Sequence, residues 1–169
     1  MLAASSKMKY RLSLQKKSEI ATNLIACLSG GTPLTDDATL FLTAWFIKGN
    51  RREKRYTDVW DIVLDRYTPS TTPILYRACD KSRRIREGKV ASYTTSFDNA
   101  LKWKTDKIIV LDTMVAQNSL AQDEEFNFSF FPLWELIKED RDFNEMVPEY
   151  EYIVRETYAG SKIFRLVYP

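Results

Sequence analysis

The segment Thr68–Cys79, TPSTTPILYRAC, separates a part of the chain with helical spacing from a part with strand spacing. Its first half is rich in Pro, Ser and Thr, which is typical of a loop. Its second half, Ile74–Cys79, is a short and mostly apolar run that predicts a strand. The change of periodicity at this segment decides the fold class.

Before this segment, apolar residues recur at three- and four-residue intervals and predict three helices. We place the helices at Ser13–Ser29, from Thr35 to about residue 47, and at about Tyr56–Tyr67. Gly30 follows the first helix as a common stop signal, and Thr35 is a candidate N-cap of the second. A basic turn, Arg51–Arg55, precedes the third helix.

After this segment, short β-branched or alternating runs predict further strands. The expected strands are Lys89–Thr94, Lys107–Leu111, Glu149–Glu156 and Ser161–Tyr168. The spacing across Tyr158–Gly160 predicts that the last two strands form a hairpin. A short helix is expected at Asp98–Lys104 and another around Leu133–Lys138. The interval 112–148 is too long for a simple loop and must contain a helix or an extra strand.

These elements predict an α+β domain in which N-terminal helices precede a mostly antiparallel sheet. A chain of 169 residues has the size of one domain. We therefore expect residues 1–169 to form a single domain, with a helical lead at 1–67 and a sheet core at 73–169.

The chain contains no histidine, which excludes several kinds of chemistry. Neither a Ser-His-Asp triad nor a Cys-His pair can be built, and a histidine-ligated metal site is impossible. No metal site is expected. Two cysteines, Cys27 and Cys79, form no CxxC motif. Free buried thiols are the favoured interpretation, although the sequence leaves a disulfide open.

The net charge of +2 conceals an uneven distribution along the chain. Residues 1–66 carry a net +4, residues 67–111 a net +5 and residues 112–169 a net −7. The middle of the chain therefore suits an anionic ligand. The apolar stretch Ile20–Leu28 is far too short to span a membrane and is a poor signal peptide. These features predict a soluble cytoplasmic protein without a membrane partner.

Three short segments carry candidate chemistry, in the order arginine, hydroxyl, carboxylate. Arg77 follows Leu75 and Tyr76 in an otherwise apolar strand. Ser92-Tyr93-Thr94 ends the next strand, and Glu149-Tyr150-Glu151 begins a late strand. Each segment alone has an ordinary structural explanation: an edge salt bridge, a turn, or the solvent face of a strand.

Together the three segments resemble the R-S-E class of ADP-ribosyltransferases, the cholera-toxin and C3-toxin type. That family has an arginine in a Leu-Tyr-Arg context, then a Ser-x-Ser/Thr pair and finally a Glu/Gln-x-Glu pair. Eight positions separate Ser92 from Ala100, and Trp103 stands where the family often has Phe. The resemblance covers roughly residues 73–169. One departure is Ala78, which stands where a glycine is common.

The resemblance implies a split β-sandwich fold and a reaction in which NAD donates ADP-ribose to a protein side chain. Glu151 and Glu149 would be the catalytic residues, with Glu149 indicating arginine as the acceptor. Arg77, Ser92, Thr94 and Tyr93 would bind NAD, with Arg77 on its phosphates and Ser92 orienting Glu151. Tyr93, Phe97 and Trp103 are candidates to stack on nicotinamide, although ordinary core packing is the favoured explanation for each of them.

Two other functions stay open at this point. An NAD glycohydrolase would use the same fold with water as the acceptor. A non-enzymatic binding module would use the basic segments Arg51–Arg55 and Arg83–Lys89. The acidic C-terminal third argues against a nucleic-acid partner without excluding it. The family analogy also implies an effector, phage-encoded or bacterial, that acts in the cytoplasm of a host cell.

Overall fold

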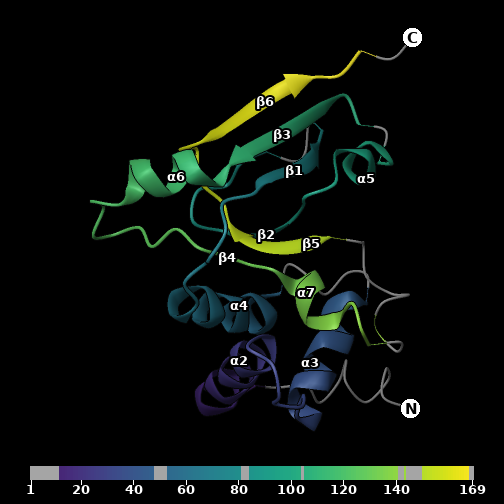
Figure 1. Ribbon diagram of the computed structural model, residues 1–169, viewed down its shortest axis with the longest axis vertical. Coiled ribbons are helices and arrows are strands. Elements are labelled where there is room, and N and C mark those ends of the chain that lie inside the picture. Colours follow the sequence, from purple (N-terminus) through teal and green to yellow (C-terminus); the bar gives the residue numbers. More distant parts are fainter. Residues whose placement is uncertain are drawn as a thin grey trace.

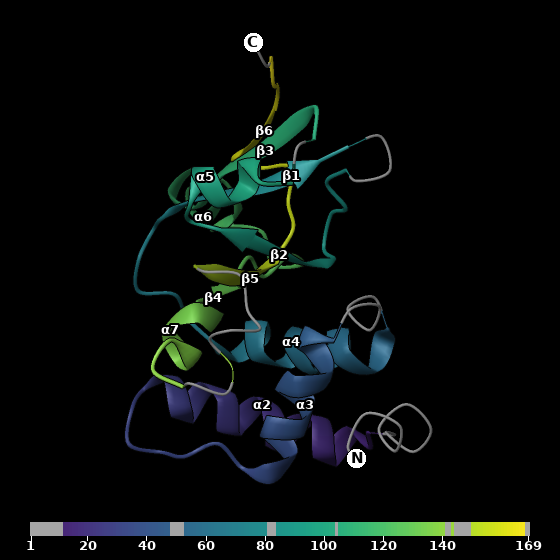
Figure 2. The ribbon, with the colours of Figure 1, turned by 90° about the vertical axis from the view of Figure 1, so that its right-hand side faces the viewer.

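A computed structural model describes residues 12–47, 53–80, 84–103, 105–140, 143 and 150–167 of the chain. These residues form an α+β fold with six helices and a six-stranded antiparallel sheet that does not close into a barrel. Three helices, α2 (Leu14–Leu28), α3 (Asp36–Phe46) and α4 (Lys54–Arg66), form a layer below the sheet in Figures 1 and 2. The predicted fold class is confirmed. None of the helices in these ranges is both long and apolar enough to cross a membrane.

The three predicted N-terminal helices are confirmed, and so is the N-cap predicted at Thr35. Helix α2 spans Leu14–Leu28, and Ser13 Oγ accepts a hydrogen bond from the Lys16 amide. Helix α3 spans Asp36–Phe46 and is capped in the same way by the side chain of Thr35. A cap of this kind stabilises a helix by about 1 kcal/mol. Helix α4 spans Lys54–Arg66, so two residues of the expected basic turn already belong to it.

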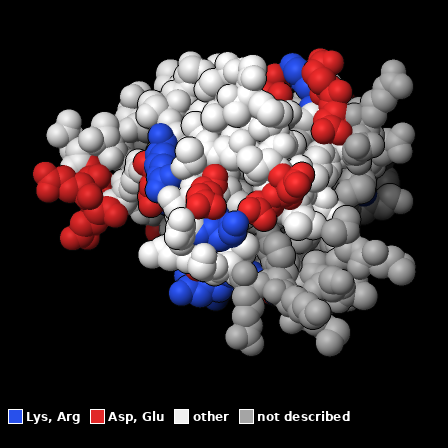
Figure 3. Space-filling view, turned by 90° about the horizontal axis from the view of Figure 1, so that it is seen from below, with Lys and Arg blue, Asp and Glu red and all other residues white. Residues whose placement is uncertain are grey.

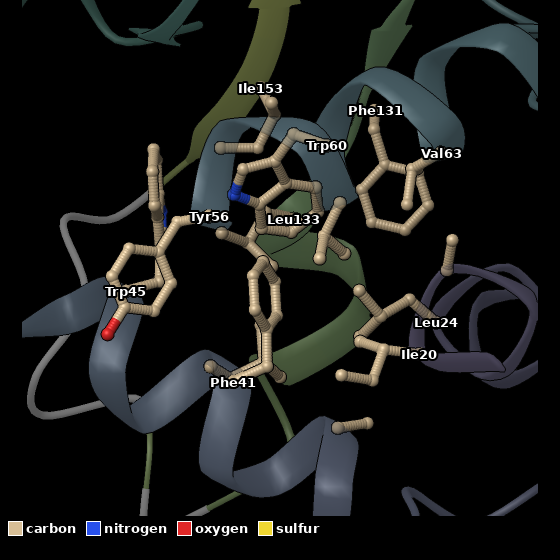
Figure 4. Packing of buried hydrophobic residues seen from close by; sticks show 14 of the residues in the cluster. Ile20, Leu24, Phe41, Trp45, Tyr56, Trp60, Val63, Phe131, Leu133 and Ile153 are labelled. Carbon is tan, nitrogen blue, oxygen red and sulfur yellow. The ribbon is translucent and has the colours of Figure 1, made fainter. Parts of the chain in front are cut away.

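These helices bury a core rich in aromatic residues, which we call the helical core (Figure 4). Trp60 lies at its centre, with ring centroids 5.2 Å from Phe41 and 5.7 Å from Trp45. Two residues of the sheet, Phe131 and Ile153, are also fully buried in this cluster. The helical layer and the sheet therefore share one hydrophobic core.

Below the helical layer, the outward-facing charges are interspersed by sign rather than gathered into one patch (Figure 3). Ion pairs between helices contribute to this pattern, because Lys16 reaches Asp37 and Lys17 reaches Asp58. The described residues of this face form no continuous basic surface of the kind that nucleic-acid binding requires.

The strand order in the sheet is β4-β5-β2-β1-β3-β6, and all neighbouring strands are antiparallel. The strands are β1 (Ile74–Cys79), β2 (Val90–Thr94), β3 (Lys107–Asp112), β4 (Phe130–Phe131), β5 (Glu151–Arg155) and β6 (Ser161–Arg165). Figures 1 and 2 show β1, β3 and β6 as one group and β2, β4 and β5 as another.

The two groups of strands are joined at a single point. Strand β1 pairs with β3 along its whole length, and β2 pairs with β5 along its whole length. Between β1 and β2, however, the described residues pair only at Tyr76 and Thr94. A second hydrophobic cluster, which includes Leu75, Tyr93 and Ile109, fills one side of this junction. We call it the sheet core.

The predicted hairpin between the last two strands is wrong. Strand β5 lies between β4 and β2, whereas β6 pairs with β3 at the opposite edge of the sheet. The connection is fixed at Gly160, which has a φ of 72° and whose carbonyl accepts a hydrogen bond from the Asp112 amide at 2.8 Å. A Cβ at Gly160 would lie 2.6 Å from the Asp112 carbonyl oxygen, so this close approach requires glycine.

The interval 112–148 contains the additional elements that its length predicted. Helix α6 spans Thr113–Leu120 directly after β3, and β4 is a two-residue strand on β5. The expected helix near residue 133 is α7, Leu133–Ile137. The predicted helix after β2 is α5, Phe97–Leu101, which is shorter than expected.

Candidate functional site

The candidate site lies at the junction of β1 and β2, on the face of the sheet that points toward the helices. Val90 and Ile153 identify this face, because both pack into the helical core. Successive side chains of a strand alternate between faces, so Ser92, Thr94 and Glu151 share it. Glu151 pairs directly with Thr94, whereas Ser92 pairs with Ile153.

Glu151 is the central residue of the site because its side chain is removed from water. The residue is only 1% exposed although it begins a strand. The ordinary explanation, a glutamate on the solvent face of a strand, therefore does not apply to Glu151. A carboxylate in such surroundings interacts more strongly with a nearby positive charge than it would in water.

The turn after Thr94 fixes the beginning of α5 beside the site. Thr94 Oγ1 accepts a hydrogen bond from the Ser96 amide at 3.0 Å. Ser96 Oγ in turn accepts one from the Asn99 amide at 3.1 Å and caps the helix. Ala100 is 3% exposed and anchors α5 against the sheet. The Thr94 side chain thus has a defined position at the end of β2.

The residue before Glu151 has an unusual backbone conformation. Tyr150 has a φ of 64°, in the left-handed region that residues other than glycine rarely adopt. Its carbonyl accepts a hydrogen bond from the Thr95 amide at 3.4 Å, which continues the pairing of β2 with β5. Such strain costs on the order of 1–3 kcal/mol and is concentrated at functional sites.

Arg77 bridges β1 and β2 beyond the point where their ladder ends. Its Nη1 donates a hydrogen bond to the Ser92 carbonyl at 2.9 Å. Its guanidinium carbon lies 5.9 Å from the centroid of the Tyr93 ring. By strand alternation Arg77 belongs to the sheet-core face, opposite the face that holds Thr94 and Glu151, and the residue is half-buried.

Tyr93 and Glu156 form a buried pair on the sheet-core face. The Tyr93 hydroxyl donates a hydrogen bond to Glu156 Oε2 at 2.8 Å, and the two residues are 3% and 1% exposed. Burial, together with the charge and hydrogen bond of Glu156, raises the pKa of Tyr93 well above its ordinary value, while Arg77 lowers it. This position does not favour the expected contact of Tyr93 with NAD, because the ring faces away from Glu151 and its hydroxyl is bonded to Glu156.

The Tyr93–Glu156 pair should make the stability of the protein sensitive to alkaline pH. The folded state keeps the Tyr93 proton, whereas the unfolded state loses it near pH 10. The contribution of this proton to the free energy of unfolding is therefore complete below pH 10. Above pH 10 it decreases by about 1.4 kcal/mol per pH unit. We expect the stability difference between wild type and Tyr93→Phe, measured by urea unfolding, to shrink between pH 10 and 11. A constant difference would contradict the assignment.

Neither cysteine is suited to act as a nucleophile. Neither cysteine forms a disulfide, and burial raises the pKa of Cys27 and of Cys79. Thiols with raised pKa values stay protonated at neutral pH and are poor nucleophiles. A covalent thiol mechanism is therefore disfavoured at the junction, where Cys79 belongs to the sheet core.

Of the residues predicted from the sequence, the structure brings Ser92, Thr94 and Glu151 together on one face. Arg77 and Tyr93 lie on the other face of the same junction. Glu149 lies outside the described residues, as do Arg51, Arg52 and Arg83 of the basic segments.

Sequence reasoning missed two aromatic pairs that flank the site. Tyr76 and Phe97 meet edge to face, with ring centroids 5.4 Å apart. Trp134 and Tyr150 meet in the same manner at 6.0 Å. Tyr76 stands next to Arg77 in the quoted motif, so strand alternation could have placed it on the opposite face from that arginine.

A groove of about 580 Å³ lies elsewhere, among the helices. Cys27, Leu34, Thr43 and Phe143 are among the residues that line it. Among the residues that the structure describes, none of the predicted site residues lines this groove, and Asp140 is its one charged lining residue.

Comparison of the chain with protein families, with curated proteins and with solved structures gives no match. The function must therefore be argued from the residues at the junction.

Proposed function

We propose that the protein is an NAD-dependent mono-ADP-ribosyltransferase that modifies a protein side chain and releases nicotinamide. One observation carries the proposal. Glu151 is buried on the inner strand β5 directly opposite Thr94, at the junction that Arg77 bridges. The proposal includes the split β-sandwich of the ADP-ribosyltransferase type, and the single pairing of β1 with β2 supports it.

Glu151 supplies the negative charge that the reaction needs. The bond between nicotinamide and ribose breaks with its electron pair going to nicotinamide, so positive charge develops on the ribose. A carboxylate that accepts a hydrogen bond from the ribose 2′-hydroxyl stabilises this charge. The acceptor nitrogen then forms the new bond to the same ribose carbon and loses a proton.

Thr94, rather than Ser92, is the residue placed to orient Glu151. Directly paired residues in an antiparallel ladder have Cβ atoms about 4.5–5.5 Å apart, whereas diagonal neighbours are roughly 7–8 Å apart. Thr94 holds the direct position and Ser92 the diagonal one. The proposal therefore moves the orienting role from the first to the second hydroxyl of the motif.

Replacing the two hydroxyl residues separately should distinguish their roles. We expect Thr94→Val to lower kcat/KM about 10- to 100-fold, because an oriented hydroxyl contributes about 1.5–3 kcal/mol when its partner is charged. Thr94→Ser should restore most of the activity, and Ser92→Ala should change it less than threefold. A larger loss in Ser92→Ala than in Thr94→Val would reverse the assignment.

Arg77 provides the fixed positive charge for the pyrophosphate of NAD. A guanidinium carries five N–H donors, so a group that holds Ser92 can also donate to a phosphate. Because Arg77 lies on a strand, its guanidinium is held more rigidly than it would be on a loop. The net +5 of residues 67–111 draws an anionic substrate toward this part of the chain.

An arginine side chain is the first candidate for the acceptor, on the basis of Glu149 in the Glu-x-Glu pair. The protein target itself is not specified by any described residue. The half-buried Trp134 and the exposed Tyr150 form a pair beside Glu151, where an incoming side chain could contact Tyr150.

The deciding experiment incubates the purified protein with NAD labelled in the adenine ring and with lysate proteins. The proposal predicts nicotinamide release together with label bound to protein. Free labelled ADP-ribose without bound label would instead identify an NAD glycohydrolase. No NAD consumption over a range of lysates, with no NAD binding by the purified protein, would overturn both enzymatic functions.

A further inference from the structure

We propose that the outer edge of β6 binds an extended, acidic segment of another protein as an added antiparallel strand. Strand β6 forms one edge of the sheet, and three strands separate it from β5, which carries Glu151 (Figure 1). The inference goes beyond the proposed function and does not depend on it, because it uses no residue of the junction between β1 and β2.

The backbone of β6 leaves hydrogen-bonding groups at the open edge of the sheet. The Leu166 amide donates to the Asp106 carbonyl at 2.7 Å, in register with the pairing of β6 and β3. In an antiparallel pair, every second residue directs its N–H and C=O to the same neighbouring strand. The residues at even positions of β6 therefore face β3, whereas Ile163 and Arg165 direct their backbone groups away from it. Among the described residues, no strand pairs with β6 on that side.

Apolar side chains are exposed on both faces of β6. Ile163 is 47% exposed and Phe164 is 49% exposed, although each pairs with a buried isoleucine of β3. Ile163 lies beside Ile109 on the sheet-core face, and Phe164 lies beside Ile108 on the opposite face. Directly paired residues share a face, so a strand added to this edge would cover both side chains.

Three cations determine the charge of the segment that fits this edge. Lys162 and Arg165 are exposed and flank the two apolar residues, and Arg165 pairs directly with Lys107 of β3. Like charges directly opposite each other in a ladder destabilise the pair. Within the part of the chain that the structure describes, none of these three cations forms an ion pair. A carboxylate placed opposite Arg165 would offset the repulsion from Lys107.

A second copy of the chain fits this edge less well than an acidic strand does. The segment Ser161–Arg165 contains no carboxylate. Pairing of β6 with β6 would therefore bring a second set of the same cations to the edge and would neutralise none of them. Lysine on an edge strand is a common protection against such self-pairing.

The sequence of β6 specifies the pattern of the segment that would complement it. Lys162-Ile163-Phe164-Arg165 reads basic, apolar, apolar, basic. An added strand that matches each position on its own face reads acidic, apolar, apolar, acidic. β-branched residues suit the two central positions, because they favour strands. Neighbouring strands of this sheet are all antiparallel, and the added strand continues that arrangement.

Fluorescence anisotropy of a labelled synthetic peptide tests the proposal on the full chain, without NAD. The peptide has Glu-Val-Val-Glu at its centre and Ser and Thr on either side. We expect saturable binding that weakens as the salt concentration increases. Arg165→Glu should weaken binding about 10-fold, because a repulsion replaces an attraction. Lys54→Glu is the matched control, since Lys54 is an exposed cation of the helical layer, and it should stay within about twofold of wild type.

Methylation of the peptide backbone distinguishes an added strand from attraction by charge alone, and it needs no variant of the protein. In antiparallel pairing, the first Glu and the second Val of the peptide lie opposite Arg165 and Ile163, so their N–H groups donate to β6. N-methylation of these two residues should weaken binding at least about 10-fold, because two hydrogen bonds are lost. N-methylation of the first Val and the second Glu should leave binding within about twofold, since their N–H groups face away from β6.

Four results would overturn the proposal. Absence of saturable binding to wild type is the first, and equal weakening by Arg165→Glu and Lys54→Glu is the second. The third is an equal effect of the two methylation patterns, which would mean that no strand is added. The fourth is a wild-type dimer, in analytical ultracentrifugation, that Ile163→Pro dissociates by removing an outward N–H, because a second copy would then occupy the edge. None of these results bears on NAD turnover, which is measured separately.

Discussion

Glu151→Gln is expected to reduce NAD-dependent ADP-ribose transfer by about 10²- to 10³-fold. The substitution keeps the size of the side chain but removes the negative charge that the positive ribose requires. Loss of one preorganised electrostatic group at an active site has typically this effect. Initial rates of nicotinamide release at saturating NAD, with purified variant and wild type, measure it.

The chain offers a closely matched control on the same strand segment. Glu156 is also 1% exposed, but it faces the sheet core and accepts the hydrogen bond of Tyr93. Glu156→Gln should therefore retain activity within about tenfold while the protein becomes less stable. If both variants lose activity equally, the cause is a disturbed β5 and not the carboxylate of Glu151.

The second large effect is expected on stability, from Arg155→Met. Arg155 joins the sheet to α4: its Nη1 donates to Asp65 Oδ1 at 2.8 Å and its Nη2 to Asp61 Oδ1 at 3.1 Å. It also donates to the Asn127 and Asp61 carbonyls. Its side chain is only 10% exposed, whereas the two aspartates are 45% and 60% exposed.

We expect Arg155→Met to lower the free energy of unfolding by about 3 kcal/mol. Removing one partner of a fully buried ion pair lowers the free energy of unfolding by roughly 3–5 kcal/mol. Because both aspartates are partly exposed, we expect a loss at the lower end of this range. Urea unfolding followed by tryptophan fluorescence measures the change. The exposed Arg165→Met on β6 is the control and should stay within about 0.5 kcal/mol of wild type. A loss below about 1 kcal/mol for Arg155→Met would show that the link is dispensable.

Much of the fold was predictable because its signals are local. The Ser13 and Thr35 caps, the glycines after α2 and the run Lys107–Leu111 each specify an element through neighbouring residues. The pairing of strands was not predictable in this way. Alternation shows that β6 is a strand, but the same alternation fits a partner at either edge of the sheet.

At the candidate site, too, the residue types could be predicted from the sequence but the strand pairing could not. The order of Arg77, Ser92-Tyr93-Thr94 and Glu151 along the chain is what suggested NAD chemistry. Strand alternation alone places Tyr93 on the opposite face of the sheet from Ser92 and Thr94. It does not show which of the two faces holds the Glu151 carboxylate. That choice depends on the register of β2 against β5, which pairs residues 57 to 65 positions apart in the chain.

The sequence by itself determined the kinds of elements, their order and the chemistry open to a protein without histidine. Each of these depends on residue types and on short spacings. The tertiary structure decided that β6 joins β3, that Thr94 and not Ser92 lies opposite Glu151, and that Tyr76 lies opposite Thr94. The physical reason is that strand partners and registers are selected by packing between distant segments. The helical core, the sheet core and the Arg155 link make that selection together.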